Sequence, residues 1–199
     1  TKEHRGKGLF RLFFSQALRN IQNAVTPDLF MLWSENTCLY KNFNFKSSGL
    51  TYYEFPENPL RDCPEGFKST TIDRLSSLQI NQLKQLHEEN LVFSSFKRDE
   101  QDWSNVKNIS SIKIFFHSSS EREIDGYFLR DKGMDLNGVI HEFTNDPKTK
   151  KAIKSFSKIT PFKPAHSDYE VIPSAMTKVL NDDVLDGIND IYCNGADCV

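Results

Sequence analysis

A glycine-rich basic turn runs directly into an apolar segment near the start of the sequence. It reads His4-Arg5-Gly6-Lys7-Gly8-Leu9-Phe10. Glycine has no Cβ, so the backbone at this turn can approach a ligand closely. A helix that follows points its unpaired N–H groups and its positive dipole end back at the turn, which suits a phosphate or another anion. The sequence therefore predicts an anion cradle at residues 6–10, assisted by Arg5; an ordinary basic loop is the alternative.

The nearly neutral net charge argues against nucleic acid or anionic lipid as a partner attracted by long-range electrostatics. Lys and Arg number 25 and Asp and Glu 27 in 199 residues, for a formal net charge of -2. Such a chain has no overall field that recruits nucleic acid or anionic lipid, and no apolar run approaches the ~18 residues of a membrane span. We expect neither a nucleic-acid nor a membrane partner, and the sequence does not predict an oligomeric state.

Four scattered cysteines do not form the spacing of a disulfide framework or a zinc site. They are Cys38, Cys63, Cys193 and Cys198. We therefore expect no metal. Because the N-terminus also lacks the apolar block of a secretory signal, the expected compartment is the reducing cytoplasm.

Hydrophobic periodicity predicts the elements that position the turn. Residues 9–25 carry an apolar stripe with the 3.6-residue period of an amphipathic helix. Residues 29–33, Leu-Phe-Met-Leu-Trp, form a short continuous apolar run typical of a central strand. A brief helix over 37–42 and a strand over 45–55 are expected to follow.

A proline-rich polar stretch from residue 56 to 66 then separates these elements from a second group. There we expect a helix from Ser76 or Ser77 to about 92, a shorter helix containing Trp103, and strands at 112–116, 124–129 and 137–143. Asp146 and Pro147 open a basic helix to about 157. A helix over 174–180 and a strand near 188–193 complete the prediction.

The order of the first elements resembles the GNAT superfamily of N-acetyltransferases. The acyl-coenzyme A loop of that family reads Arg/Gln-x-x-Gly-x-Gly/Ala, and Arg5, Gly8 and Phe10 fall on its fixed positions, with Phe10 replacing a small residue. The family's tyrosine followed by Gly-Phe is similar to the stretch from Tyr40 to Asn44-Phe45. Asparagine tolerates the left-handed backbone that glycine adopts there. The resemblance implies an α+β, mixed-sheet acyl-CoA N-acyltransferase (GNAT-like) fold.

The second group of elements is similar to the front of another GNAT unit, but Asp146 and Pro147 stand where a glycine loop is usual. We therefore expect two units: residues 1–56 as the C-terminal half of a GNAT-like domain, 57–75 as a linker, and 76–199 as a second domain without the usual cofactor loop. The family places three or more strands before its loop, whereas four residues precede Arg5. The chain is thus expected to be either a fragment of a tandem protein or, less favoured, a circularly permuted domain whose missing strands come from residues 110–143.

The resemblance implies N-acetyl transfer from acetyl-CoA to an unidentified small-molecule or peptide amine. It assigns the cofactor cradle to Arg5, Gly6, Lys7, Gly8, Leu9 and Phe10, with Asn36 as a further contact. Tyr40 would be the acid for the departing thiolate, because a phenol is protonated at neutral pH; a packed aromatic is the alternative. The strand that carries the family's base would precede Thr1. Glu142, in the corresponding place of the second unit, is a candidate substrate contact. A non-catalytic binding or scaffold protein, and a transferase of another acyl group, are the competing functions.

Overall fold

The computed structural model describes residues 6–32, 34, 36–59, 62–90, 97–119, 123–133, 136–165 and 168–181. Its chain divides into two compact units. The first comprises the described residues of Thr1–Ser48 and Ala175–Asp190, and the second those of Gly49–Ser174. Strands β2 (Lys46–Phe55) and β8 (Asp168–Val179) each begin in one unit and end in the other.

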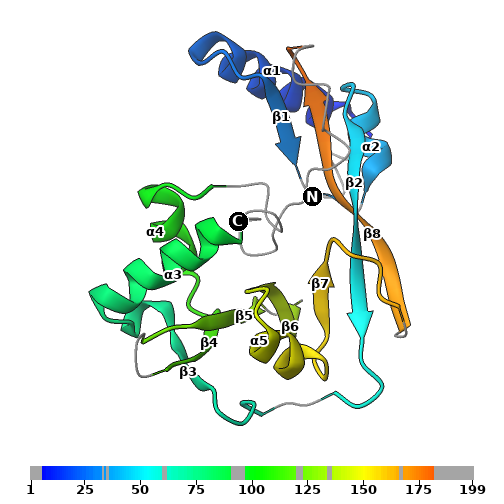
Figure 1. The fold of residues 1–199 in the computed structure, drawn as a ribbon. Coiled ribbons are helices and arrows are strands. Elements are labelled where there is room, and N and C mark those ends of the chain that lie inside the picture. The colour runs from blue at the N-terminus through cyan, green and yellow to red at the C-terminus, as the bar shows by residue number, and fades with distance from the viewer. Residues whose placement is uncertain are drawn as a thin grey trace. The chain divides into compact units, whose positions relative to one another are not determined.

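The first unit contains α1 (Leu9–Ala24), β1 (Leu29–Leu32) and α2 (Thr37–Lys41), as the hydrophobic pattern predicts (Figure 1). Its strands follow the order β1-β8-β2. Strand β1 pairs antiparallel with the end of β8, from Leu29 opposite Val179 to Leu32 opposite Met176. The buried core of this unit is formed by Leu18, Phe45 and Met176, with Phe14, Phe30, Leu32, Tyr40 and Phe43 packed against it.

The segment around residues 174–180 is a strand, so the helix predicted there is wrong. Residues 175–177 are buried in the end of β8. The Thr177 hydroxyl forms a hydrogen bond with the hydroxyl of Ser48, 129 residues earlier in the chain. Pairing with β1 decides the conformation, because a strand's stability depends on its partners more than on its own propensity. This segment thus clusters with the first unit, although 76–199 was expected to form the second; the GNAT-like domain boundaries stay a prediction.

The second unit is built on the strand order β8-β2-β7-β6-β5-β4-β3. The pairs β2·β7, β3·β4, β4·β5 and β5·β6 are antiparallel, whereas β6 and β7 are parallel. Its elements between β2 and β8 are β3 (Lys68–Thr71), η2 (Ile72–Arg74), α3 (Ser77–Glu89), α4 (Glu100–Asn108), β4 (Lys113–His117), β5 (Gly126–Lys132), β6 (Leu136–Phe143), α5 (Pro147–Ile153) and β7 (Lys158–Thr160).

Helices cover both faces of the sheet in the second unit. Alternate strand residues point to opposite faces, and one face, with Ile114, Tyr127 and Leu129, packs in a cluster with α3 and α4. The other face, with Phe115 and Phe128, packs with Ile153 of α5 and with Phe156. In the part of the chain that the structure describes, no helix combines the length and apolar character that a membrane crossing needs.

Several predicted boundaries differ from the structure. The expected linker 57–75 carries β3 and η2, and Ile72 of η2 is buried in the core. Strand β7 was not expected, and α5 ends at Ile153 rather than near 157. Strand β3 is polar and short, so its pairing with β4, and not its own pattern, forms it. The strand predicted near 188–193 lies outside the described residues.

Candidate functional site: two helix starts and a buried carboxylate

The N-terminus of α1 is left open by its sequence. Gly8 is the N-cap residue, with φ 70°, and no side chain among the described residues caps the helix; the first turn contains no acidic residue. Gly6 also has a left-handed backbone, with φ 77°. The first intrahelical hydrogen bond runs from the Leu12 N–H to the Gly8 carbonyl at 3.1 Å, so the N–H groups of the preceding helical residues have no partner within the helix.

The described residues also leave space at this turn. A Cβ placed on Gly6 or Gly8 meets no atom within 4 Å, and residues 6–10 are all exposed. The arrangement can bind an anion through backbone N–H groups and the helix dipole, with the cationic side chain of Lys7 beside it. Arg5, the other predicted charge, lies outside the described residues.

Tyr40 lies against the start of α1. Its ring contacts Phe10 edge-to-face with centroids 5.8 Å apart, and it contacts Phe14 at 5.4 Å. Asn44, after α2, has φ 64°, which is the left-handed conformation expected from the sequence. No hydrogen bond joins the Tyr40 hydroxyl to another described residue. The structure therefore brings Tyr40 to the predicted cradle through the ring of Phe10.

Asn36 occupies the N-cap position of α2, but its side chain makes no capping hydrogen bond. Its backbone N–H donates to the Ser34 hydroxyl at 3.1 Å. The side chain is exposed. Asn36 thus stands at the N-cap position without capping the helix through its side chain, and its predicted cofactor contact stays a prediction.

The N-terminus of α5, in contrast, is filled by its own N-cap. The Asp146 carboxylate accepts a hydrogen bond from the Thr149 N–H at 2.8 Å and from the Thr144 hydroxyl at 2.6 Å. His117 Nε2 lies 3.1 Å from the same carboxylate, and Pro147 supplies no N–H at the first helical position. Burial raises the pKa of Asp146, but these hydrogen bonds more than offset it and hold that pKa below its usual value.

Gly126 makes room for this arrangement. A Cβ on Gly126 would lie 2.6 Å from His117 Nε2 and still closer to the Asp146 carboxylate. The Asp-Pro start of α5 was predicted from the sequence. Gly126, His117 and Thr144 were not predicted to lie around the Asp146 carboxylate. The only local signal was Thr144, two residues before the cap.

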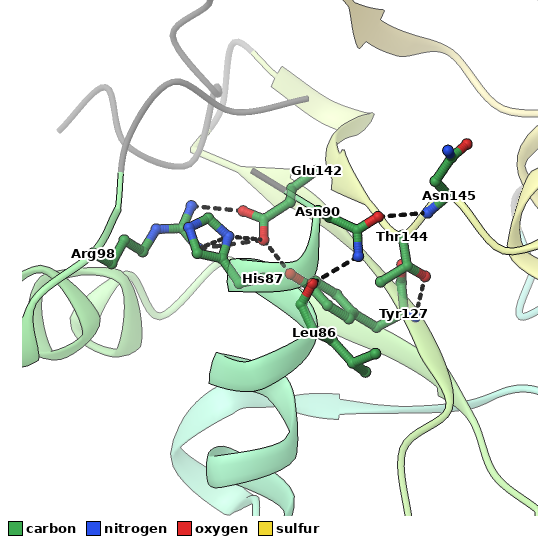
Figure 2. Close-up of polar contacts among 8 residues, drawn as sticks. All are labelled: Leu86, His87, Asn90, Arg98, Tyr127, Glu142, Thr144 and Asn145. Atoms are coloured by element: carbon green, nitrogen blue, oxygen red, sulfur yellow. Dashed lines mark hydrogen bonds and ion pairs between the residues drawn. The ribbon is translucent and has the colours of Figure 1, made fainter. Parts of the chain in front are cut away.

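Glu142, the predicted substrate contact, lies in a buried polar cluster between β6 and the helices α3 and α4 (Figure 2). Arg98 Nη2 donates to Glu142 Oε2 at 2.6 Å. His87 Nδ1 lies 3.1 Å from Oε1, and the Tyr127 hydroxyl donates to the same oxygen. Arg98 also stacks over the Trp103 ring, 4.8 Å from its centroid.

These contacts fix the charge of Glu142. Burial would raise its pKa, but the Arg98 guanidinium and His87 more than offset burial and hold the pKa below the usual value. A substrate could reach this carboxylate only by displacing one of its donors. Arg98, His87 and Tyr127 were not predicted from the sequence, because they come from three segments that only the fold brings together.

The Asn90 side chain contacts the chain just after the C-terminal end of β6, close to Glu142. The Asn90 side chain, at the end of α3, donates to the Leu86 carbonyl at 2.6 Å and accepts from the Asn145 N–H at 3.0 Å (Figure 2). The turn between β6 and α5 is therefore held by the side chains of Asn90 after α3 and His117 of β4, and by its own Thr144 and Asp146. Side chains of the protein thus form hydrogen bonds to this turn, whereas Gly8, at the start of α1, makes no side-chain capping bond.

Comparison with known proteins finds similarity in three dimensions only. No protein-family model matches the sequence, and no curated protein matches it. Among solved structures, a conserved protein of unknown function from Enterococcus faecalis, suggested to be an N-acyltransferase, superposes with a TM-score of 0.56 at 14% identity. The match covers 89% of this chain and 51% of that one.

Two further structures match comparably. A GCN5-related N-acetyltransferase from Kribbella flavida gives a TM-score of 0.56 at 13% identity, over 90% of this chain and 50% of that one. A proposed acetyltransferase from Pyrococcus horikoshii gives 0.54 at 16% identity, over 98% and 66%. The chain spans about half the length of the first two structures. Its α+β, mixed-sheet architecture is the fold of the GCN5-related N-acetyltransferases.

Proposed function

We propose that this protein transfers an acetyl group from acetyl-CoA to the nitrogen of an amine acceptor. The observation that carries the proposal is the open N-terminus of α1. Two left-handed glycines precede it, no side chain in the described part of the chain caps it, and no acidic residue occupies its first turn. In a unit of this fold, these features suit the pyrophosphate of a coenzyme A thioester.

The roles of the residues follow from their chemistry. The backbone N–H groups at Gly8, Leu9 and Phe10 would bind the pyrophosphate oxygens, with Lys7 and Arg5 adding positive charge and Asn36 as a further contact. Tyr40 would donate a proton to the coenzyme A thiolate as the thioester breaks, since a phenol is protonated at neutral pH. The acceptor amine must lose a proton before or as it attacks the thioester carbonyl, and the residue that takes this proton is not assigned.

A binding protein without transferase activity is the second candidate. The observation that favours it is the start of α5, where Asp146 already satisfies the helix. If the first unit served only to bind its ligand, acetyl-CoA would stabilise the protein without being consumed. Transfer of another acyl group would instead appear as turnover with a different thioester.

Calorimetric titration with acetyl-CoA, paired with thermal unfolding, tests the cofactor assignment. At ~100 times its dissociation constant, a bound ligand raises the free energy of unfolding by about 2.7 kcal/mol. Gly8→Val should abolish binding, because the side chain fills the space beside the N–H groups. Gly133→Val is the matched control: Gly133 has φ 66°, and a Cβ there also meets no atom within 4 Å. Equal loss of binding in both variants, or no binding to the unmodified protein, would contradict the assignment.

Tyr40→Phe separates catalysis from binding. It removes the hydroxyl and keeps the ring contacts with Phe10 and Phe14. If Tyr40 is the acid, release of coenzyme A thiol from acetyl-CoA with an amine acceptor should fall by ~10²–10⁴-fold, while the dissociation constant of acetyl-CoA stays within about twofold. An unchanged rate would leave Tyr40 as a packing residue.

A further inference from the structure

The side chain of Phe10 lies between the start of α1 and Tyr40. Phe10 is the second residue of α1, and it is 39% exposed. Its ring stands edge-to-face to the Tyr40 ring, with centroids 5.8 Å apart and an interplanar angle of 83°. It meets the ring of Phe43, after α2, in the same way at 6.0 Å, and it stacks on Phe14 at 5.3 Å. Phe10 thus joins the first turn of α1 to α2 and to the turn that follows α2.

The backbone of Phe10 belongs to the candidate anion cradle. The first hydrogen bond within α1 runs from the Leu12 N–H to the Gly8 carbonyl, so the Phe10 N–H has no partner inside the helix. N–H groups in this position point toward the helix N-terminus, where an anion would bind. One residue therefore presents a donor to the ligand and a ring to Tyr40.

Ring contacts determine where the hydroxyl of Tyr40 points. Besides Phe10, the Tyr40 ring contacts Phe14 at 5.4 Å and Phe45 at 6.3 Å. Phe14 and Phe45 lie in the core cluster of the first unit, whereas Phe10 is more exposed and lies at the cradle. Edge-to-face pairs have a preferred geometry, so each contact constrains the orientation of the Tyr40 ring. A general acid must come within hydrogen-bond reach of its acceptor, and a rotated ring would carry the hydroxyl away from it.

We propose that Phe10 is a positioning residue, whose ring holds Tyr40 in the orientation that protonates the coenzyme A thiolate. The inference rests on the proposed function. In that reaction the acceptor nitrogen bonds to the acetyl carbonyl carbon, the carbon–sulfur bond breaks, and the Tyr40 hydroxyl gives its proton to the sulfur. The phenolate then regains a proton from solvent. Phe10 takes no part in these bond changes and acts only through Tyr40.

Steady-state kinetics, with release of coenzyme A thiol from acetyl-CoA as the readout, tests this role. The amine probes are L-lysine, spermidine and a lysine-containing peptide. Phe10→Leu removes the ring but keeps the backbone N–H and an apolar side chain. It should lower kcat by ~10–100-fold, as expected when a reacting group is displaced, while KM for acetyl-CoA stays within about twofold. Phe13→Leu, the same change at a position of α1 that is 72% exposed, is the matched control and should change neither.

Two further variants separate positioning from a general loss of stability. Phe10→Leu added to Tyr40→Phe should lower kcat no further, because residues that act through one group are not additive. Phe10→Tyr keeps a ring at this position and should recover most of the kcat that Phe10→Leu loses.

The outcomes distinguish this inference from the proposed function. Unchanged kcat in Phe10→Leu, or losses from Phe10→Leu and Tyr40→Phe that multiply in the double variant, would overturn the role of Phe10 and leave acetyl transfer standing. Loss of acetyl-CoA affinity in Phe10→Leu with unchanged kcat would make its ring a binding contact and would also overturn the positioning role. No turnover by the unsubstituted protein would overturn the proposed transfer, and this inference with it.

Discussion

The N-termini of α1 and α5 differ in whether a side chain of the protein bonds to the first N–H groups of the helix. Each helix begins with N–H groups that have no partner within the helix. At α5, Asp146 supplies the acceptor from within the chain, and His117 and Thr144 hold its carboxylate in place. At α1, Gly8 supplies no side chain at all. Among the described residues, no side chain accepts a hydrogen bond from the first N–H groups of α1.

The difference shows that a helix N-terminus need not be an anion-binding site. A phosphate at α5 would meet a carboxylate whose pKa lies below its usual value, so it would encounter repulsion and no free donors. Strand β6, which leads into α5, is fixed in addition by the buried Glu142 cluster (Figure 2). In the second unit, Asp146 binds an N–H group at the start of α5 and so stabilises the fold. In the first unit, no described side chain does the same at the start of α1.

The largest expected effect is at Glu142. Glu142→Ala should lower the free energy of unfolding by about 3–5 kcal/mol, because Arg98 is left as a buried charge without its partner. Acetyl-CoA affinity should not change. Urea unfolding, followed by tryptophan fluorescence, measures the loss. The paired variant Arg98→Leu/Glu142→Leu should recover much of it. Loss of activity with unchanged stability would instead support Glu142 as a substrate contact.

A smaller effect is expected from acidification, through His141 on the same strand. His141 is buried, and the Lys132 N–H donates to its Nε2 at 3.3 Å. Burial, assisted by Lys132, lowers the pKa of His141 to about 4 from an ordinary 6.5. The unfolded chain therefore binds more protons than the folded one between these values, and stability falls as the pH drops through this window, by on the order of 3 kcal/mol in total.

Urea unfolding at pH 7 and pH 4.5 checks this prediction. His141→Gln should remove most of the loss between these two values. Any remaining decline toward lower pH belongs to carboxylates such as Glu142 and Asp146, whose pKa values lie below their usual range. The same pH dependence in the variant and the unsubstituted protein would show that His141 is not the group responsible.

The smallest effects test the self-capped turn directly. Gly126→Ala should cost about 1–3 kcal/mol of stability, because its methyl group crowds Asp146 and His117, and Asp146→Ala should cost about 1 kcal/mol as a lost N-cap. Since the methyl group meets the side chain that Asp146→Ala removes, the double variant should lose less than the sum. Additive losses would show that Gly126 is not needed to accommodate the cap. None of these variants should bind acetyl-CoA at α5.

Much of the local structure could be predicted, because it depends on neighbouring residues. The periodicity of α1, the capping residues Ser76 and Asp146, and the strands β4 to β6 each depend on chemistry within a few positions. The candidate cradle was predicted for the same reason, since glycines and the helix that follows them are adjacent. The polar partners of Asp146 and Glu142 were not, because His117 lies 29 residues from Asp146 and Arg98 lies 44 from Glu142.

The sequence by itself determined that a glycine turn precedes α1 and that Asp146 and Pro147 begin α5. Only the tertiary structure decided that residues 168–179 form a strand, that β1 lies at the end of the strand order, and that Glu142 is buried against Arg98. Helix starts and turns are stabilised by groups a few residues apart. Strand pairing and buried charges take their free energy from residues far along the chain, as between Ser48 and Thr177, so no local pattern contains them.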